Sequence, residues 1–105
     1  MFCASALGQT APSGTETIEK TTTSKADLQK ALADSFTFCD RVWADTTDRN
    51  AATPGKYPAF IPLPPPTRLG ALVFSASHDA EHYGNLVTYL RAKGLVPPSS
   101  QPVVK

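Results

Sequence analysis

The prolines of this chain are concentrated in one stretch, and they limit the possible folds more than any other feature. Six of the ten prolines lie between Pro54 and Pro66. Because a proline has no backbone N–H donor, this stretch can form neither a helix interior nor a central strand. Extended polyproline geometry is expected instead. The prolines therefore predict a connector over residues 54–66, between two regions that can form helices.

The connector has two interpretations. Its segment Pro62–Pro65 fits the P-x-x-P pattern of polyproline ligands. Alternatively, the connector is a stiff crossover whose apolar side chains pack onto the fold, namely Tyr57, Phe60, Ile61 and Leu63. We favour the crossover, because a P-x-x-P match alone carries little information.

Before the connector, the sequence predicts an amphipathic helix from Ser24 to about Asp48. Ser24 and Asp27 have the spacing of a capping box, and the helix breakers in residues 50–55 end the pattern. The apolar face has spacings of three and four residues and consists of Leu28, Leu32, Ser35, Cys39, Val42 and Thr46, widened by Ala31, Phe36 and Trp43.

The N-terminal part is predicted to hold less regular structure. Residues 1–8 are typical of the last turns of a helix that is stopped by Gly8, and residues 9–23 are typical of a loop. The first residues also resemble a signal peptide, but no Lys or Arg precedes the short apolar run. These weak features argue against export.

After the connector, a second helix is predicted from Thr67 to Gly94, with Gly94 as its C-cap and two prolines beyond. Its heptad seam has the 4-3-4-3 spacing of a left-handed bundle and consists of Leu69, Val73, Ala76, Ala80, Tyr83, Val87 and Leu90. A second stripe on the other side consists of Ala71, Phe74, His78, His82, Leu86 and Tyr89. Two apolar sides predict that more than one neighbouring helix covers this helix.

Length, charge and cysteine content set further limits. A chain of 105 residues allows one domain, over 1–105. Its net charge of +1 gives no basic excess for nucleic acid or anionic lipid, and no apolar run approaches the roughly 20 residues that span a bilayer. We therefore expect no nucleic acid and no membrane as partner. Cys3 and Cys39 are too few for a disulfide framework, so we expect reduced thiols in a cytoplasmic protein.

His78 and His82 are the candidate metal ligands. They are the only histidines, and their i, i+4 spacing on a helix places both rings on one face. A His-x-x-x-His pair also occurs as plain surface histidines or with one ring capping a carbonyl. The apolar stripe around this pair favours rings that point into a bundle interior and share a cation.

A zinc-protease interpretation of the same segment is less favourable. The string His78–His82 matches H-x-x-E-H with Glu81 as base, but no Asp or Glu follows Glu81 to complete such a site. We interpret Asp79 and Glu81 as flanking residues, with an outer-shell contact from a carboxylate to an imidazole N–H left open. Cys39 is a weaker candidate for a third ligand than for a core residue, so this ligand is not evident in the chain.

The segment Thr67–Ser100 resembles the C-terminal part of the DinB/YfiT-like family of metalloenzymes, above all in His-Asp-Ala-Glu-His-Tyr-Gly followed by Lys-Gly-Leu-Val-Pro-Pro. Residues 19–28 and the Phe-Cys-Asp at 38–40 are similar to the preceding segment of that family. The resemblance implies an all-α, up-down-up-down four-helix bundle, here with only the C-terminal two to three helices and the proline-rich crossover.

The resemblance also implies a site of three histidines for a divalent ion, zinc or nickel, of which His78 and His82 are two. The third would lie upstream of Met1, because the family's second helix continues into a run like Phe2-Cys3-Ala4-Ser5. Some relatives are thiol-dependent transferases or isomerases, so we expect a metal-dependent enzyme with thiol-transfer or hydrolytic chemistry and a small thiol as partner. The alternative is a non-catalytic helical fragment that forms a homodimer to complete its bundle.

Overall fold

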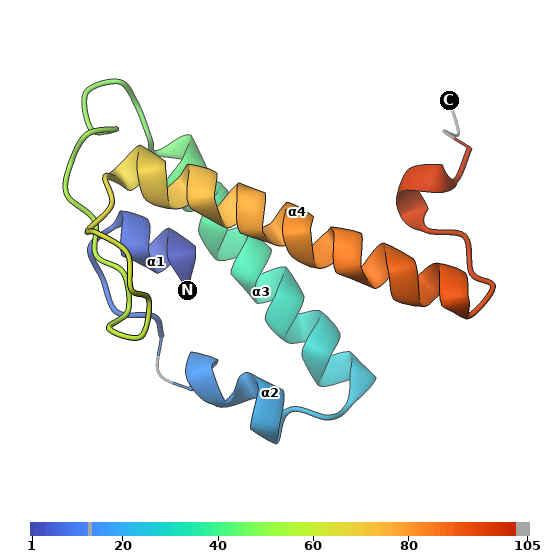
Figure 1. Cartoon of the computed structure of the whole chain (residues 1–105). Helices are drawn as coiled ribbons and strands as arrows, with labels where there is room; N and C mark the ends of the chain where they lie inside the picture. Colours follow the sequence, from blue (N-terminus) through green and yellow to red (C-terminus); the bar gives the residue numbers. More distant parts are fainter. Residues whose placement is uncertain (13, 103–105) are drawn as a thin grey trace. The chain divides into compact units, whose positions relative to one another are not determined.

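The structure, a computed structural model, describes residues 1–12 and 14–102, and these form helices without any strand (Figure 1). The α-helices are α1 (Phe2–Ala6), α2 (Ile18–Thr21), α3 (Lys25–Ala44) and α4 (Arg68–Ala92), and two 3-10 helices span Thr15–Thr17 and Pro98–Ser100. The prediction of an all-α fold is confirmed. The chain divides into two compact units, Met1–Ser75 and Ala76–Lys105, and α4 contributes to both.

The predicted helix starts and the glycine stops are confirmed. At the start of α3, the Ser24 hydroxyl accepts a hydrogen bond from the Asp27 N–H at 3.1 Å and donates one to the Asp27 carboxylate at 2.6 Å. At the start of α4, the Thr67 hydroxyl accepts from the Gly70 N–H at 3.1 Å. Gly8 and Gly94 adopt the left-handed conformation, with φ of 67° and 70°. These local bonds satisfy the backbone groups that a helix end leaves without partners.

Two predicted boundaries are wrong. The helix α3 ends at Ala44 rather than near Asp48, because Asn50 organises a turn there: its side chain accepts from the Thr47 N–H and donates to the Asp45 carbonyl. The predicted loop over 9–23 contains α2 and a 3-10 helix. Residue 13 of that loop, and residues 103–105 of the predicted domain, lie outside the described residues.

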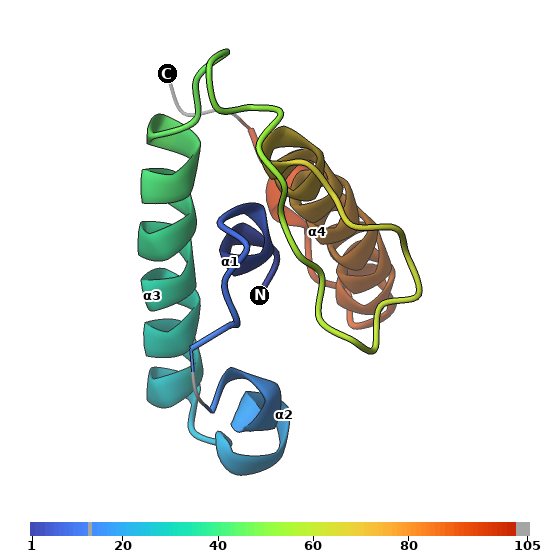
Figure 2. The ribbon, with the colours of Figure 1, turned by 90° about the vertical axis from the view of Figure 1, so that its left-hand side faces the viewer.

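The first unit, Met1–Ser75, is built around α1. Figure 2 shows this short helix beside α3. Its residues Cys3 to Ala6 are buried, and the hydrophobic core consists of Cys3, Ala6, Val42, Ala71 and Leu72. Phe2, Tyr57 and Phe74 pack beside it in edge-to-face and tilted pairs, with ring centroids 5.1 to 6.5 Å apart. The unit therefore has one small core formed by α1, α3 and the start of α4.

The connector is fixed at its two ends. The Gly55 N–H donates to the Pro66 carbonyl at 2.8 Å, and the Lys56 N–H donates to the Ser5 carbonyl of α1 at 2.9 Å. As predicted, the connector forms neither helix nor strand. Tyr57 packs against the core, but Phe60 is 68% exposed and Leu63 is also exposed. The expectation that all four apolar side chains pack onto the fold is therefore wrong for Phe60 and Leu63.

The two cysteines form a disulfide, which overturns the prediction of reduced thiols. Cys3 of α1 and Cys39 of α3 are joined across a sequence separation of 36 residues. The prediction was based on the number of cysteines, which does not show that α1 packs on α3. This packing brings the two sulfur atoms within bonding distance. The argument for a reducing, cytoplasmic location from these thiols no longer holds, so the location stays a prediction.

The second unit contains the rest of α4 and the segment that follows it. Beyond Gly94 the chain turns back along the helix, and the Ser99 N–H donates to the Tyr83 hydroxyl at 3.0 Å. Arg91 donates to the Ser100 hydroxyl at 3.4 Å. Pro97 is the one buried residue among the described residues of this unit.

Within the described part of the chain, none of the helices combines the length and the apolar character that a membrane span needs.

Candidate metal centre

His78 and His82 lie in the second unit, one helical turn apart on α4. Their rings are nearly perpendicular, with centroids 4.4 Å apart, and the two Nε2 atoms are 3.0 Å apart. The prediction that helical spacing brings both imidazoles together on one face is confirmed. No other residue is needed for this arrangement, because both side chains come from the same helix.

The distance between the two Nε2 atoms fits two ligands of a single ion. With a metal–nitrogen distance of about 2.0 to 2.1 Å, two imidazoles are roughly 2.9 Å apart at a right angle and roughly 3.4 Å apart at a tetrahedral angle. The observed 3.0 Å lies inside this interval. Neutral imidazole is also a suitable donor for zinc and nickel. The pair therefore offers two nitrogen donors at a separation that one ion could bridge, and an N–H···N hydrogen bond between the rings has the same separation.

The predicted burial of the rings is wrong. The His78 side chain is 35% exposed, and His82 is exposed. The stripe that contains them does pack at its beginning, where Ala71 is buried, but Leu86 and Tyr89 further along are exposed. Hydrophobic periodicity marks which side of a helix is apolar, whereas burial depends on whether another element covers that side.

Glu81 is the carboxylate beside this pair. Its Oε2 lies 3.7 Å from Nδ1 of His78, the ring nitrogen that does not face His82. This separation allows electrostatic attraction but is longer than an N–H···O hydrogen bond. Glu81 is therefore a flanking carboxylate of His78, and an outer-shell hydrogen bond from its carboxylate to the imidazole N–H stays a prediction.

A third ligand does not come from the described residues. Among residues 1–12 and 14–102, no group of three His, Cys, Asp or Glu side chains is placed to hold an ion. Cys39 is excluded, because its sulfur is bonded to Cys3. The carboxylate of Asp34 on α3 accepts a hydrogen bond from Lys30 at 2.6 Å, and this bond raises the pKa of the Lys30 ammonium group.

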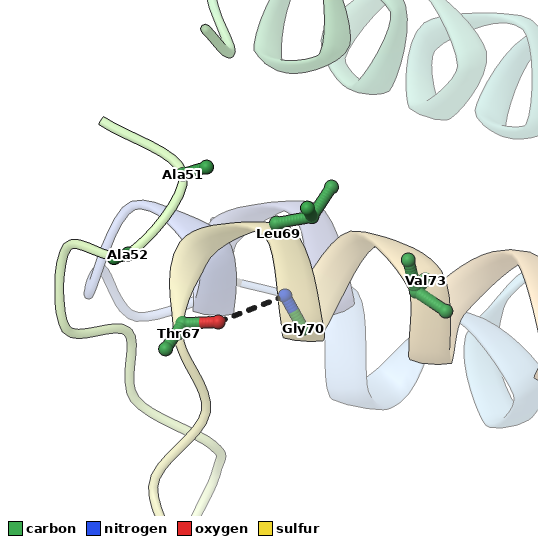
Figure 3. A pocket seen from close by; sticks show the side chains of 6 residues that line it. All are labelled: Ala51, Ala52, Thr67, Leu69, Gly70 and Val73. Atoms are coloured by element: carbon green, nitrogen blue, oxygen red, sulfur yellow. Dashed lines mark hydrogen bonds between the residues drawn. The ribbon is translucent and has the colours of Figure 1, made fainter. Parts of the chain in front are cut away.

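A hollow at the start of α4 was not predicted from the sequence (Figure 3). It is lined by Ala51, Ala52, Thr67, Leu69, Gly70 and Val73. The one hydroxyl in this set, on Thr67, already accepts from the Gly70 N–H. The hollow lacks a titratable or metal-binding side chain and offers only an apolar surface.

Comparison with known proteins identifies one family. The sequence model of the DinB superfamily matches residues 1–86, which include both histidines and both cysteines. No curated protein and no solved structure matches the chain.

Proposed function

Because the chain belongs to the DinB superfamily, we propose that it binds a divalent metal ion through the Nε2 atoms of His78 and His82. The observation that carries this proposal is the 3.0 Å distance between the two Nε2 atoms. Zinc and nickel are the candidate ions, since both accept imidazole ligands. A partner group or water completes the coordination.

Metal binding is tested on the purified protein with Zn²⁺ and Ni²⁺ in a calorimeter. The variants His78→Ala and His82→Ala are each expected to lose about ten-fold or more in affinity, because one of two protein donors is removed. Leu86→Ala is the matched control, since Leu86 is an exposed residue on the same stripe without a donor atom. Unchanged affinity in both histidine variants would contradict the proposal.

The proposed chemistry is metal-dependent, with a thiol-transfer or hydrolytic reaction. A bound ion with open coordination positions would polarise a substrate oxygen or hold a small thiol as thiolate. This chain contributes the two imidazoles and leaves their outer faces accessible, because His82 is exposed. Co²⁺-loaded protein is expected to develop a thiolate absorption band when a small thiol is added, and His82→Ala is expected to lose it. A band of equal strength in His82→Ala would contradict thiol binding at this site.

A second candidate function is non-catalytic and consists of homodimer formation. Leu69 and Val73 of the heptad seam are exposed, Val73 by 55%. Leu28, Leu32 and Phe36 on α3 are exposed as well. Apolar positions with bundle spacing that remain uncovered favour a second copy as the missing neighbour.

Sedimentation separates the two candidates. We expect a dimer at micromolar concentration that Val73→Asp converts to a monomer, because a buried charge at the seam costs several kcal/mol. His82→Ala is the control and should leave the dimer intact. A wild-type chain that stays monomeric throughout this range would rule out the homodimer without affecting the metal proposal.

A further inference from the structure

The two ring nitrogens of His78 face different partners. Nδ1 lies 3.7 Å from the Glu81 carboxylate, and Nε2 lies 3.0 Å from Nε2 of His82. All three residues belong to one unit and one helix. Helical spacing places the three side chains as neighbours.

These contacts determine where the imidazole protons lie. A contact between two Nε2 atoms needs one donor and one acceptor, and a neutral imidazole carries one N–H. If His78 donated from Nε2, its Nδ1 lone pair would face the negative carboxylate of Glu81 at 3.7 Å, which is repulsive. If His78 carries its proton on Nδ1, that N–H points toward Glu81, and Nε2 accepts from His82. The second arrangement is the favourable one.

We propose that Glu81 is a positioning residue that holds His78 in the Nδ1–H tautomer and so presents its Nε2 lone pair to the ion. This inference rests on the proposed metal site. It also distinguishes the two histidines. His78 has the tautomer that a ligand requires before metal arrives, whereas His82 carries its proton on Nε2. Coordination through Nε2 would require His82 in its other neutral form, with the Nε2 proton released to solvent and a proton from solvent taken up at Nδ1, so the ring would stay neutral.

Asp79 provides a matched control for Glu81. It carries the same charge, but it lies one residue from His78 and three residues before His82, so it is a neighbour of the other histidine rather than of His78. Glu81 is at i+3 from His78, where side chains of a helix are neighbours. A change of the His78 tautomer confined to the Glu81 variants therefore reports the contact with Glu81, whereas an equal change in Asp79→Ala reports charge alone.

The first experiment reads the tautomers without metal. Long-range proton–nitrogen NMR spectra of metal-free protein at alkaline pH, where imidazoles are neutral, should show His78 as Nδ1–H and His82 as Nε2–H. In Glu81→Ala, His78 should shift toward the Nε2–H form, which predominates in the absence of a partner. Asp79→Ala should leave His78 in the Nδ1–H form. An unchanged His78 tautomer in Glu81→Ala would overturn the proposal.

The second experiment measures Zn²⁺ affinity by competition with a chelator. Glu81→Ala should weaken binding by about ten-fold, the lower end of outer-shell effects, because the Glu81 side chain is 73% exposed. Glu81→Gln should lose less Zn²⁺ affinity, since the partial negative charge of its amide oxygen still attracts the Nδ1–H of His78. Leu86→Ala, at an exposed position of the same stripe that carries no charge, should stay within about two-fold. Equal losses of affinity in Glu81→Ala and Leu86→Ala would overturn the positioning role.

The two experiments fail in different ways. If His78→Ala and His82→Ala both bind Zn²⁺ as well as the wild type, the proposed metal site is wrong, and the tautomer spectra still decide whether Glu81 sets the tautomer of His78. If the histidine variants lose Zn²⁺ affinity but the His78 tautomer is the same in Glu81→Ala and the wild type, only the positioning role of Glu81 is wrong. Helical content by circular dichroism should be equal in all variants, because each substituted side chain lies on the exposed part of α4.

Discussion

The two units of this chain differ in packing: the first contains the buried core, whereas the second contains the two neighbouring histidines. The first unit, Met1–Ser75, contains the hydrophobic core, the disulfide and the hydrogen bonds that fix the connector. The second unit contains both histidines, and Pro97 is its one buried residue among those described. A helix satisfies its own backbone hydrogen bonds and positions i, i+4 pairs by itself. Two imidazoles can therefore be held next to each other where little tertiary packing is present.

The largest expected effect is loss of the disulfide, which should destabilise the first unit alone. The bond closes a loop with a sequence separation of 36 residues, and its removal in Cys3→Ala/Cys39→Ala should cost roughly 4 kcal/mol by loop entropy. The same loss of unfolding free energy can be measured on the wild type by urea unfolding with and without a reductant. Zn²⁺ affinity of the folded protein should not change. Equal unfolding midpoints in oxidised and reduced protein would show that the core does not need the bond.

The next largest effect is expected when one leucine from each unit is replaced by alanine and the losses of unfolding free energy are compared. Leu72 is 0% exposed in the core of the first unit, whereas Leu86 is 57% exposed in the second. Leu72→Ala should lower the free energy of unfolding by about 3 kcal/mol, because it leaves a cavity. Leu86→Ala should change it by less than about 0.5 kcal/mol. Similar losses in both variants would mean that the second unit buries Leu86 in solution and that the contrast between units is wrong.

Helix ends could be predicted because their signals are local. Ser24, Thr67, Gly8 and Gly94 each act on backbone groups within a few residues, and the sequence contains all the information needed. The same is true of the histidine pair, whose proximity follows from the helical repeat. The Asn50 turn that ends α3 early is also local, but a Thr-rich segment without Gly or Pro gave no distinct signal for it.

Properties of residue pairs from distant segments could not be predicted. The disulfide depends on α1 packing against α3, and neither cysteine carries a sequence signal for the other. The same limit applies to α4, where the core contains Ala71 and Leu72 while Leu69 and Val73 of the heptad seam are exposed. Periodicity identifies apolar sides of a helix, and tertiary contacts select which of them is buried.

Alanine substitutions at one glycine in each unit should have smaller and opposite effects on stability. A Cβ on Gly55 would lie 2.5 Å from the Ser5 carbonyl oxygen, whereas a Cβ on Gly84 meets nothing within 4 Å. Gly55→Ala should therefore destabilise the first unit by about 2 kcal/mol, as overpacking does. Gly84→Ala should stabilise α4 by about 0.5 to 1 kcal/mol, because glycine is costly inside a helix. Chemical unfolding tests the Gly55→Ala prediction, and hydrogen exchange of the α4 amides tests the Gly84→Ala prediction. A Gly55→Ala variant that is more stable than the wild type would contradict the close approach of Gly55 to the Ser5 carbonyl oxygen.

The smallest effect concerns Tyr83, whose hydroxyl accepts from the Ser99 N–H and fixes the C-terminal segment to α4. The hydrogen bond from Ser99, with a smaller contribution from the positive charge of Arg91, lowers the pKa of Tyr83 below its ordinary 10.0. Because the folded pKa is the lower one, ionisation strengthens the attachment: the extra stability is full above the unfolded pKa and is lost as pH falls through the folded pKa.

Alkaline titration of tyrosine absorbance tests this attachment. Subtracting the Tyr83→Phe curve from the wild-type curve should isolate a phenol with a pKa below 10.0, and Ser99→Pro, which removes the donating N–H, should move that pKa upward. Tyr89→Phe is the control, because Tyr89 is an exposed residue of the same helix. A Tyr83 pKa that Ser99→Pro leaves unchanged would mean that the segment detaches in solution. In that case the second unit would consist of an isolated stretch of helix, and the contrast with the packed first unit would be larger still.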